Sequence, residues 1–177
     1  MKVSAPVVHF STASKVIHLV AAIAFIASLI IMLFDPIPNS FSFDLHQSLG
    51  VLVLVLFGIR ILWINWAGKP DAQGSKIEKF IAHSAHFAMY AISLAMPLSG
   101  LLIAMAKAKD TVVFGLFTIP GFAERNSGLI DFSYQLHSMM EILCYLLIAM
   151  HTCATIFHQL VLKDGTLARM MGVNNNV

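Results

Sequence analysis

Residues 132–162 read FSYQLHSMMEILCYLLIAMHTCATIFHQLVL, a largely apolar stretch with a few polar side chains spread along it. At about 1.5 Å per residue, a helix of this length exceeds the roughly 30 Å hydrocarbon core of a bilayer. We therefore predict a membrane-crossing helix from about 132 to 162. Asp131 or Ser133 is its predicted N-cap, because both residue types accept hydrogen bonds from a first helical turn.

Three further apolar runs come before this stretch. They predict helices over residues 14–34, 45–66 and 80–106. Pro97 lies inside the third run, and we expect it to kink that helix without ending it, because apolar sequence continues beyond it. The predicted fold class is all-α: an integral membrane four-helix bundle that forms a single domain over residues 1–177.

The composition excludes other classes of protein. With 58% apolar and 11% charged residues in a chain of 177, a water-soluble globule is excluded. The net charge of +2 is small and the basic residues are scattered, which excludes a nucleic-acid surface. Cys144 and Cys153 form no C-x-x-C motif and are interpreted as small residues of a membrane helix.

Lysines and arginines predict which end of the bundle faces the cytoplasm, where these residues are in excess. Eight lie on one side and three on the other: Lys2, Lys15, Arg60, Lys69, Lys76, Lys79, Lys163 and Arg169 against Lys107, Lys109 and Arg125. Both termini are therefore predicted to be cytoplasmic. The end with the termini is called the inner end, and the end with the connection 107–131 is called the outer end.

Eight histidines require an explanation in a chain with so few polar residues. An ionisable side chain at membrane depth is costly, so it usually faces the bundle interior and has a function. On the predicted topology His46 and His137 are the two histidines of the outer level. His137 and His151 are fourteen residues apart, which places them on one helix face about 21 Å apart along the axis.

Two levels of paired imidazoles are the arrangement that holds two haems stacked across a bilayer, each iron between two histidines. The haem would be a non-covalent b type, because neither cysteine belongs to a C-x-x-C-H motif. Bis-histidine ligation leaves no open iron position and so favours electron transfer. His46 and His137 are the predicted outer ligands. His151 is an inner ligand, and the spacing leaves three candidates for its partner: His18, His83 and His86.

The propionate carboxylates of a haem in a membrane must be paired with cations or solvated. This points to polar side chains near the two surfaces. The candidates for contacts to propionates or to a quinone are Arg60, His83, His86, Lys107, Lys109 and Arg125. Glu141, one turn from His137, has three open roles: accepting a hydrogen bond from His137, moving quinone protons, or packing as a protonated acid. No catalytic residue is assigned.

Several motifs in a fixed order carry a family resemblance. They are Ile17-His18, Asp44-Leu45-His46, Ala82-His83-Ser84-Ala85-His86, Met96-Pro97-Leu98-Ser99-Gly100, Leu136-His137, Ala149-Met150-His151 and the segment KDGTLARMM at 163–171. With these motifs the chain resembles the bacterial four-helix di-haem cytochrome b561 family over almost its whole length. The resemblance implies that His18 and His151 hold the inner haem, and that His46 and His137 hold the outer one.

The resemblance also implies a bacterial inner membrane and electron exchange with ubiquinone, with oxidation of superoxide at the outer face in some members. The leading hypothesis is a superoxide:ubiquinone oxidoreductase with two b haems, whose partners are membrane lipid, ubiquinone, and superoxide or a redox donor protein. One alternative is a cytochrome subunit that relays electrons for a separate dehydrogenase or hydrogenase. A distant alternative is a histidine-lined metal transporter, against which the scarcity of membrane carboxylates argues. The sequence leaves the oligomeric state open.

Overall fold

A computed structural model describes residues 10–34, 37–68, 70 and 74–171. Four long helices form the bundle: α1 (Thr12–Leu33), α2 (Phe41–Ala67), α3 (Lys76–Ala106) and α4 (Ser127–Phe157). The π-helical turn η1 (His158–Leu162) extends α4, and the short helix α5 (Thr166–Met171) follows. Between α3 and α4, the strands β1 (Thr111–Val113) and β2 (Phe117–Ile119) pair as an antiparallel hairpin.

The predicted all-α membrane bundle is confirmed, because four helices of the described chain are long and apolar enough to cross a membrane. All four begin earlier than predicted. Their N-caps are Ser11, Ser40, Ser75 and Asn126, and each cap side chain accepts a hydrogen bond from the backbone N–H three residues later. Each cap thus adds a polar first turn to an apolar span, which a hydropathy pattern does not report.

The predicted N-cap of the last helix is wrong. Asn126 caps α4 through a 3.0 Å hydrogen bond from the Leu129 N–H, several residues before Asp131 and Ser133. Ser133 lies inside the helix, where its buried hydroxyl donates to the carbonyl of Leu129. The prediction for Pro97 is correct in that α3 continues through it without ending.

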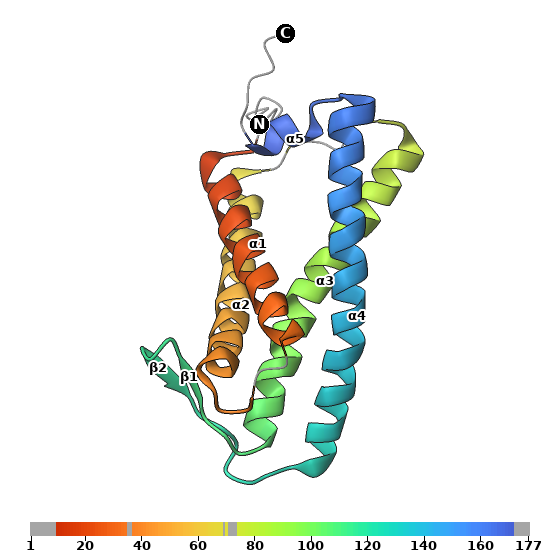
Figure 1. The fold of residues 1–177 in the computed structure, drawn as a ribbon. Helices are drawn as coiled ribbons and strands as arrows, with labels where there is room; N and C mark the ends of the chain where they lie inside the picture. The colour runs from red at the N-terminus through yellow and green to blue at the C-terminus, as the bar shows by residue number, and fades with distance from the viewer. Residues whose placement is uncertain (1–9, 35–36, 69, 71–73, 172–177) are drawn as a thin grey trace.

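The bundle consists of two helix pairs (Figure 1). α1 packs along α2 and α3 along α4, while contacts between α2 and α3 join the pairs. The beginning of α1, η1 and α5 share one end, and the hairpin lies at the other, beside α2 (Figure 1). An apolar cluster from α1, α3 and α4 forms the core; its buried members are Leu29, Ile92, Met96, Cys144 and Leu147.

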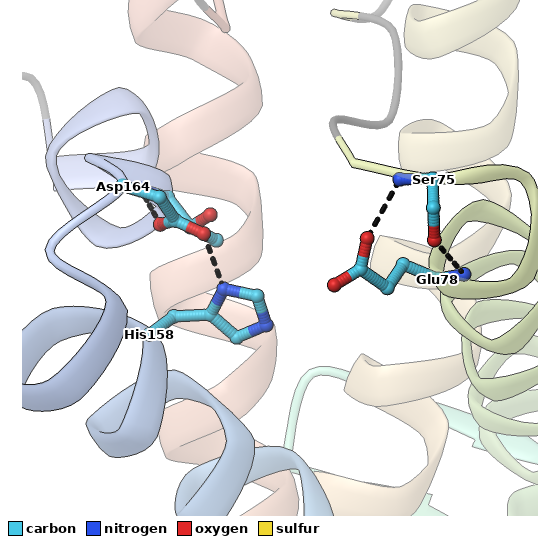
Figure 2. Close-up of polar contacts among 5 residues, drawn as sticks. Ser75, Glu78, His158 and Asp164 are labelled. Carbon is cyan, nitrogen blue, oxygen red and sulfur yellow. Dashed lines mark hydrogen bonds and ion pairs between the residues drawn. The ribbon is translucent and has the colours of Figure 1, made fainter.

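Two polar pairs border the inner end (Figure 2). Ser75 and Glu78 form a capping box at the start of α3, and His158 bonds Asp164 at 2.5 Å at the end of α4. Partial burial by itself raises the pKa of Asp164, but hydrogen bonds from His158 and from Thr166 outweigh it and hold the pKa below its ordinary value. These contacts fix the turn that leads from η1 into α5.

Candidate functional site

Two imidazoles from different helices meet at the outer end. His46 on α2 and His137 on α4 have ring centres 6.4 Å apart and ring planes at 85°. Both rings are partly buried. The structure therefore brings together the two histidines that the predicted topology places at this level.

The backbone of α1 orients His46. Its Nδ1 lies 3.1 Å from the carbonyl oxygen of Ser28 and 2.9 Å from the Ser28 hydroxyl. A carbonyl oxygen can only accept, so the hydrogen of the imidazole is on Nδ1. His46 thus donates from Nδ1 to the backbone of the neighbouring helix.

His137 has an equivalent contact with α3. The Ser99 hydroxyl donates to the Met96 carbonyl at 2.8 Å and lies 2.9 Å from Nδ1 of His137. Because its only hydrogen is used on Met96, this hydroxyl accepts from Nδ1–H of His137. The next residue, Gly100, allows the close approach: a Cβ at this position would lie 3.0 Å from Cε1 of His137.

Both outer imidazoles are therefore in the same tautomer. With the hydrogen on Nδ1, each Nε2 of a neutral ring carries a lone pair, and neither Nε2 has a hydrogen-bond partner in the described part of the chain. A histidine that ligates a metal typically donates its other N–H to a carbonyl or similar acceptor in this way. The outer pair thus offers two oriented nitrogen ligands.

A second pair of imidazoles lies at the inner end. His18 on α1 and His151 on α4 have ring centres 6.5 Å apart and planes at 81°. His83 lies elsewhere, with its exposed ring donating to the carbonyl of Lys79 in its own helix at 2.7 Å. His86 is exposed on α3. Of the three candidates, His18 is the one whose ring faces that of His151.

The inner pair differs from the outer pair in its Nδ1 contact. Arg60 on α2 places its Nη1 against Nδ1 of His18. A guanidinium can only donate, so in this arrangement Nδ1 of His18 accepts. Nε of Arg60 is buried without a hydrogen-bond partner among the described residues, and the guanidinium carbon lies 6.0 Å from the ring centre of Tyr90.

The outer cations lie near the other surface. Lys107 donates to the Tyr134 hydroxyl at 2.5 Å, and Lys109 donates to the Asn39 side chain at 3.4 Å. Arg125 is exposed shortly before α4. In residues 10–171, apart from the gaps in that range, none of these three cations hydrogen-bonds to the outer imidazoles.

Glu141 does not accept a hydrogen bond from His137. Its carboxylate accepts from the Tyr145 hydroxyl at 3.3 Å, and Ser99 takes the position at Nδ1 that one sequence hypothesis gave to Glu141. Ser28 and Ser99 were not predicted from the sequence as partners of the histidines. The available signal was a small hydroxyl residue within an apolar helix, although helix neighbours must be known before it can be assigned to a histidine.

The family model of prokaryotic cytochrome b561 matches residues 9–172. The chain belongs to this family. It is 32% identical over 135 residues to cytochrome b561 homolog 2 of Escherichia coli (strain K12), covering 75% of this chain and 72% of that protein. It is also 32% identical over 129 residues to the probable superoxide oxidase CybB of Yersinia pestis, covering 72% and 73%.

Membership of the cytochrome b561 family confirms the resemblance and makes this chain a multi-pass membrane cytochrome that takes part in electron transport. It also implies that the protein binds haem b. Within the described ranges no group of three or more His, Cys, Asp and Glu side chains could hold a metal ion.

The imidazole pairs of this cytochrome fit haem iron in their separation. Metal–imidazole bonds are about 2.0–2.1 Å long, and each nitrogen lies about 1.1 Å from its ring centre, so opposite ligands of one metal have ring centres about 6.3 Å apart. The observed separations are 6.4 and 6.5 Å. Aromatic rings that pack directly on one another can have the same distance between ring centres. The position of the hydrogen on each imidazole is therefore the stronger evidence that these rings can ligate iron. The outer pair fits as it stands, whereas the inner pair fits once Arg60 leaves Nδ1 of His18.

Proposed function

We propose that this cytochrome b561 is a di-haem protein of the bacterial inner membrane that oxidises superoxide at its outer end and reduces ubiquinone. The observation that carries the proposal is an imidazole pair at each end of the bundle, with Nδ1 of both outer rings hydrogen-bonded to a neighbouring helix so that Nε2 is available. Each end has two nearly perpendicular imidazoles with centres 6.4 or 6.5 Å apart, and α4 contributes one ring to each pair.

In this proposal His46 and His137 hold the outer haem iron, and His18 and His151 hold the inner one. The haems, when bound, supply one-electron redox centres whose iron has no open coordination position. Ser28 and Ser99 hold hydrogens on Nδ1 and so keep the outer Nε2 atoms available for iron.

Arg60 has a role at the inner end. Its guanidinium is partly buried and its Nε lacks a partner among the described residues. A haem propionate would supply a carboxylate acceptor and would draw the guanidinium away from His18. His18 can then take its hydrogen on Nδ1 and present Nε2 to the iron, as the outer histidines do.

The overall reaction balances as two superoxide anions, one ubiquinone and two protons giving two dioxygen molecules and one ubiquinol. The likeness to a protein named probable superoxide oxidase supports superoxide as the donor. Lys107, Lys109 and Arg125 would attract this anion at the outer end. His83 and His86, exposed near the inner end of α3, are the proposed hydrogen-bond partners of the quinone.

Haem counting tests the ligand assignment. The purified protein should contain two b haems per chain with low-spin reduced-minus-oxidised spectra. Alanine at either ligand of one pair should remove one haem and leave the other, for His46 and His137 and likewise for His18 and His151. His83→Ala is the matched control for haem content, because the His83 ring bonds the Lys79 carbonyl of its own helix and belongs to neither imidazole pair, and it should keep both haems. One haem in the unmodified protein, or no loss in His18→Ala, would overturn the inner assignment.

A second measurement separates the oxidase from an electron relay. Protein with both haems is mixed with a ubiquinone analogue and an enzymatic source of superoxide, and ubiquinol is followed. We expect ubiquinol formation that superoxide dismutase abolishes and that slows as ionic strength rises. Intact haems without superoxide-dependent ubiquinol would refute the oxidase, and co-purification with a dehydrogenase would then favour the relay.

A further inference from the structure

The hairpin between α3 and α4 exposes several large apolar side chains. Residues 111–119, TVVFGLFTI, carry no charge. Thr111 and Val113 are buried against the bundle, since β1 packs on α2 and α3. On the opposite side, Val112 is 52% exposed beside the exposed Thr118, its partner on β2. Leu116 at the tip is 82% exposed, and Phe117, which pairs with Val113 and shares its side of the hairpin, is still 53% exposed.

This hairpin has a defined conformation. Its tip closes with a 2.9 Å hydrogen bond from the Leu116 N–H to the Val113 carbonyl, and both residues between them, Phe114 and Gly115, have positive φ. Asn, Asp or Gly usually occupies such positions, so an aromatic residue there is unusual. The conformation places the half-exposed Phe114 at the tip.

The base of the hairpin is fixed as well. The Gly121 N–H donates to Asp110 at 2.9 Å, and a Cβ on Gly121 would lie 2.6 Å from the backbone nitrogen of Lys109. The two chain segments therefore cross in close contact. The direction in which the hairpin leaves the bundle is set by these contacts.

Ser48 on α2 holds the hairpin against this helix through two hydrogen bonds. The Phe114 N–H donates to the Ser48 hydroxyl at 3.0 Å, and this hydroxyl donates to the Val112 carbonyl at 3.4 Å. Asp44 is an exposed carboxylate on α2, and Ser48 is one helical turn, about 6 Å, further along the axis, so the hairpin is attached close to a charged position of this helix. Figure 1 shows the hairpin projecting sideways next to the first turns of α2.

We propose that this hairpin inserts its apolar tip and its exposed apolar side chains into the outer leaflet at the headgroup boundary and anchors the protein to lipid beside α2. Its surface continues the lipid-facing side of α2, where Val55 and Ile59 are exposed. Phenylalanine and leucine suit this interfacial depth, as in amphipathic segments that lie in the membrane plane. The unpaired backbone groups at the free strand edge keep the hairpin out of the hydrocarbon centre.

Spin labelling in lipid vesicles tests the depth. Cys153→Ser removes the exposed native thiol, while Cys144 is buried. In this background Leu116→Cys is spin-labelled, reconstituted into phosphatidylcholine–phosphatidylglycerol vesicles, and probed with oxygen and with a water-soluble nickel chelate. The matched control is Glu124→Cys, an exposed charged position in the same connection.

The label at 116 should collide several-fold less often with nickel than the label at 124, and more often with oxygen. Equal nickel accessibility at the two positions would show that the hairpin lies in water and would overturn the proposal. Protection from both probes would show coverage by a second copy of this chain, which also overturns it. Phe117→Cys repeats the measurement at a second exposed position, so that one poorly folded variant does not decide the outcome.

Discussion

Ser99→Ala removes the hydroxyl that accepts the Nδ1–H of His137. The residue is 2% exposed, so water does not replace the lost oxygen easily. Without haem the ring can move its hydrogen to Nε2, but a ring that binds iron through Nε2 must keep the hydrogen on Nδ1. The cost of the missing acceptor therefore falls on the haem-bound state.

The expected magnitude follows from this difference. A buried donor without a partner costs about 1–3 kcal/mol. At about 1.4 kcal/mol per factor of ten, this range includes the roughly 10- to 100-fold loss of metal affinity found when the hydrogen-bond partner of a ligating histidine is removed. We expect the affinity of the outer haem to fall by that factor, while the inner haem is retained.

The assay is a haem titration of the apoprotein, read by the absorption of bound haem and accompanied by a redox titration. Ser93→Ala is the matched control: Ser93 lies on the same helix and donates to the Met89 carbonyl at 2.7 Å, with no histidine at its hydroxyl. We expect the outer-haem affinity and midpoint potential to change in Ser99→Ala and to stay unchanged in the control. Equal effects of the two substitutions would refute the role given to Ser99.

Three further substitutions test other parts of the site and the inner end. Ser28→Ala should weaken the outer haem less than Ser99→Ala does, because its backbone carbonyl remains 3.1 Å from the imidazole; a haem titration that finds the reverse order contradicts this. Gly100→Ala should lower outer haem content, because its Cβ would lie 3.0 Å from the His137 ring, whereas Gly58→Ala, with open space around it, should leave haem content unchanged. The lowered pKa of Asp164 stabilises the η1–α5 turn fully above the ordinary carboxyl pKa, and this contribution is lost as pH falls through the folded-state value. Asp164→Asn should therefore remove the acid dependence of amide hydrogen exchange in this turn, and an unchanged pH profile would contradict the assignment.

Hydropathy predicted the helices because each one presents apolar side chains both to lipid and to the neighbouring helices. The same signal could not locate the helix starts, since Ser40 and Asn126 stabilise first turns through local hydrogen bonds that are independent of hydropathy. The hairpin was missed for a similar reason. Its strands have three residues each, too few for an alternating pattern, and its turn carries Phe114 where Asn is the usual signal.

Histidine spacing gave the level of each imidazole, because position along a helix converts directly into depth. It could not give the hydrogen-bond partners, which depend on which helices are neighbours. Sequence placed Arg60 at the inner end, but its contact with His18 depends on how α1 and α2 pack. The opposite tautomers of His18 and the outer histidines therefore became visible only in the structure.

On the proposed haem assignment, the separation between the two imidazole levels makes electron transfer between them depend on the membrane potential. The levels are about 21 Å apart within a hydrocarbon layer of about 30 Å, so an electron moving between them crosses about seven-tenths of the membrane field. At about 2.3 kcal/mol per charge for each 100 mV, this amounts to roughly 1.6 kcal/mol. A membrane potential of about 100 mV, negative inside, would therefore lower the equilibrium constant for inward electron transfer more than tenfold. Superoxide oxidation coupled to ubiquinone would thus slow in a highly energised cell and speed up when the membrane potential falls.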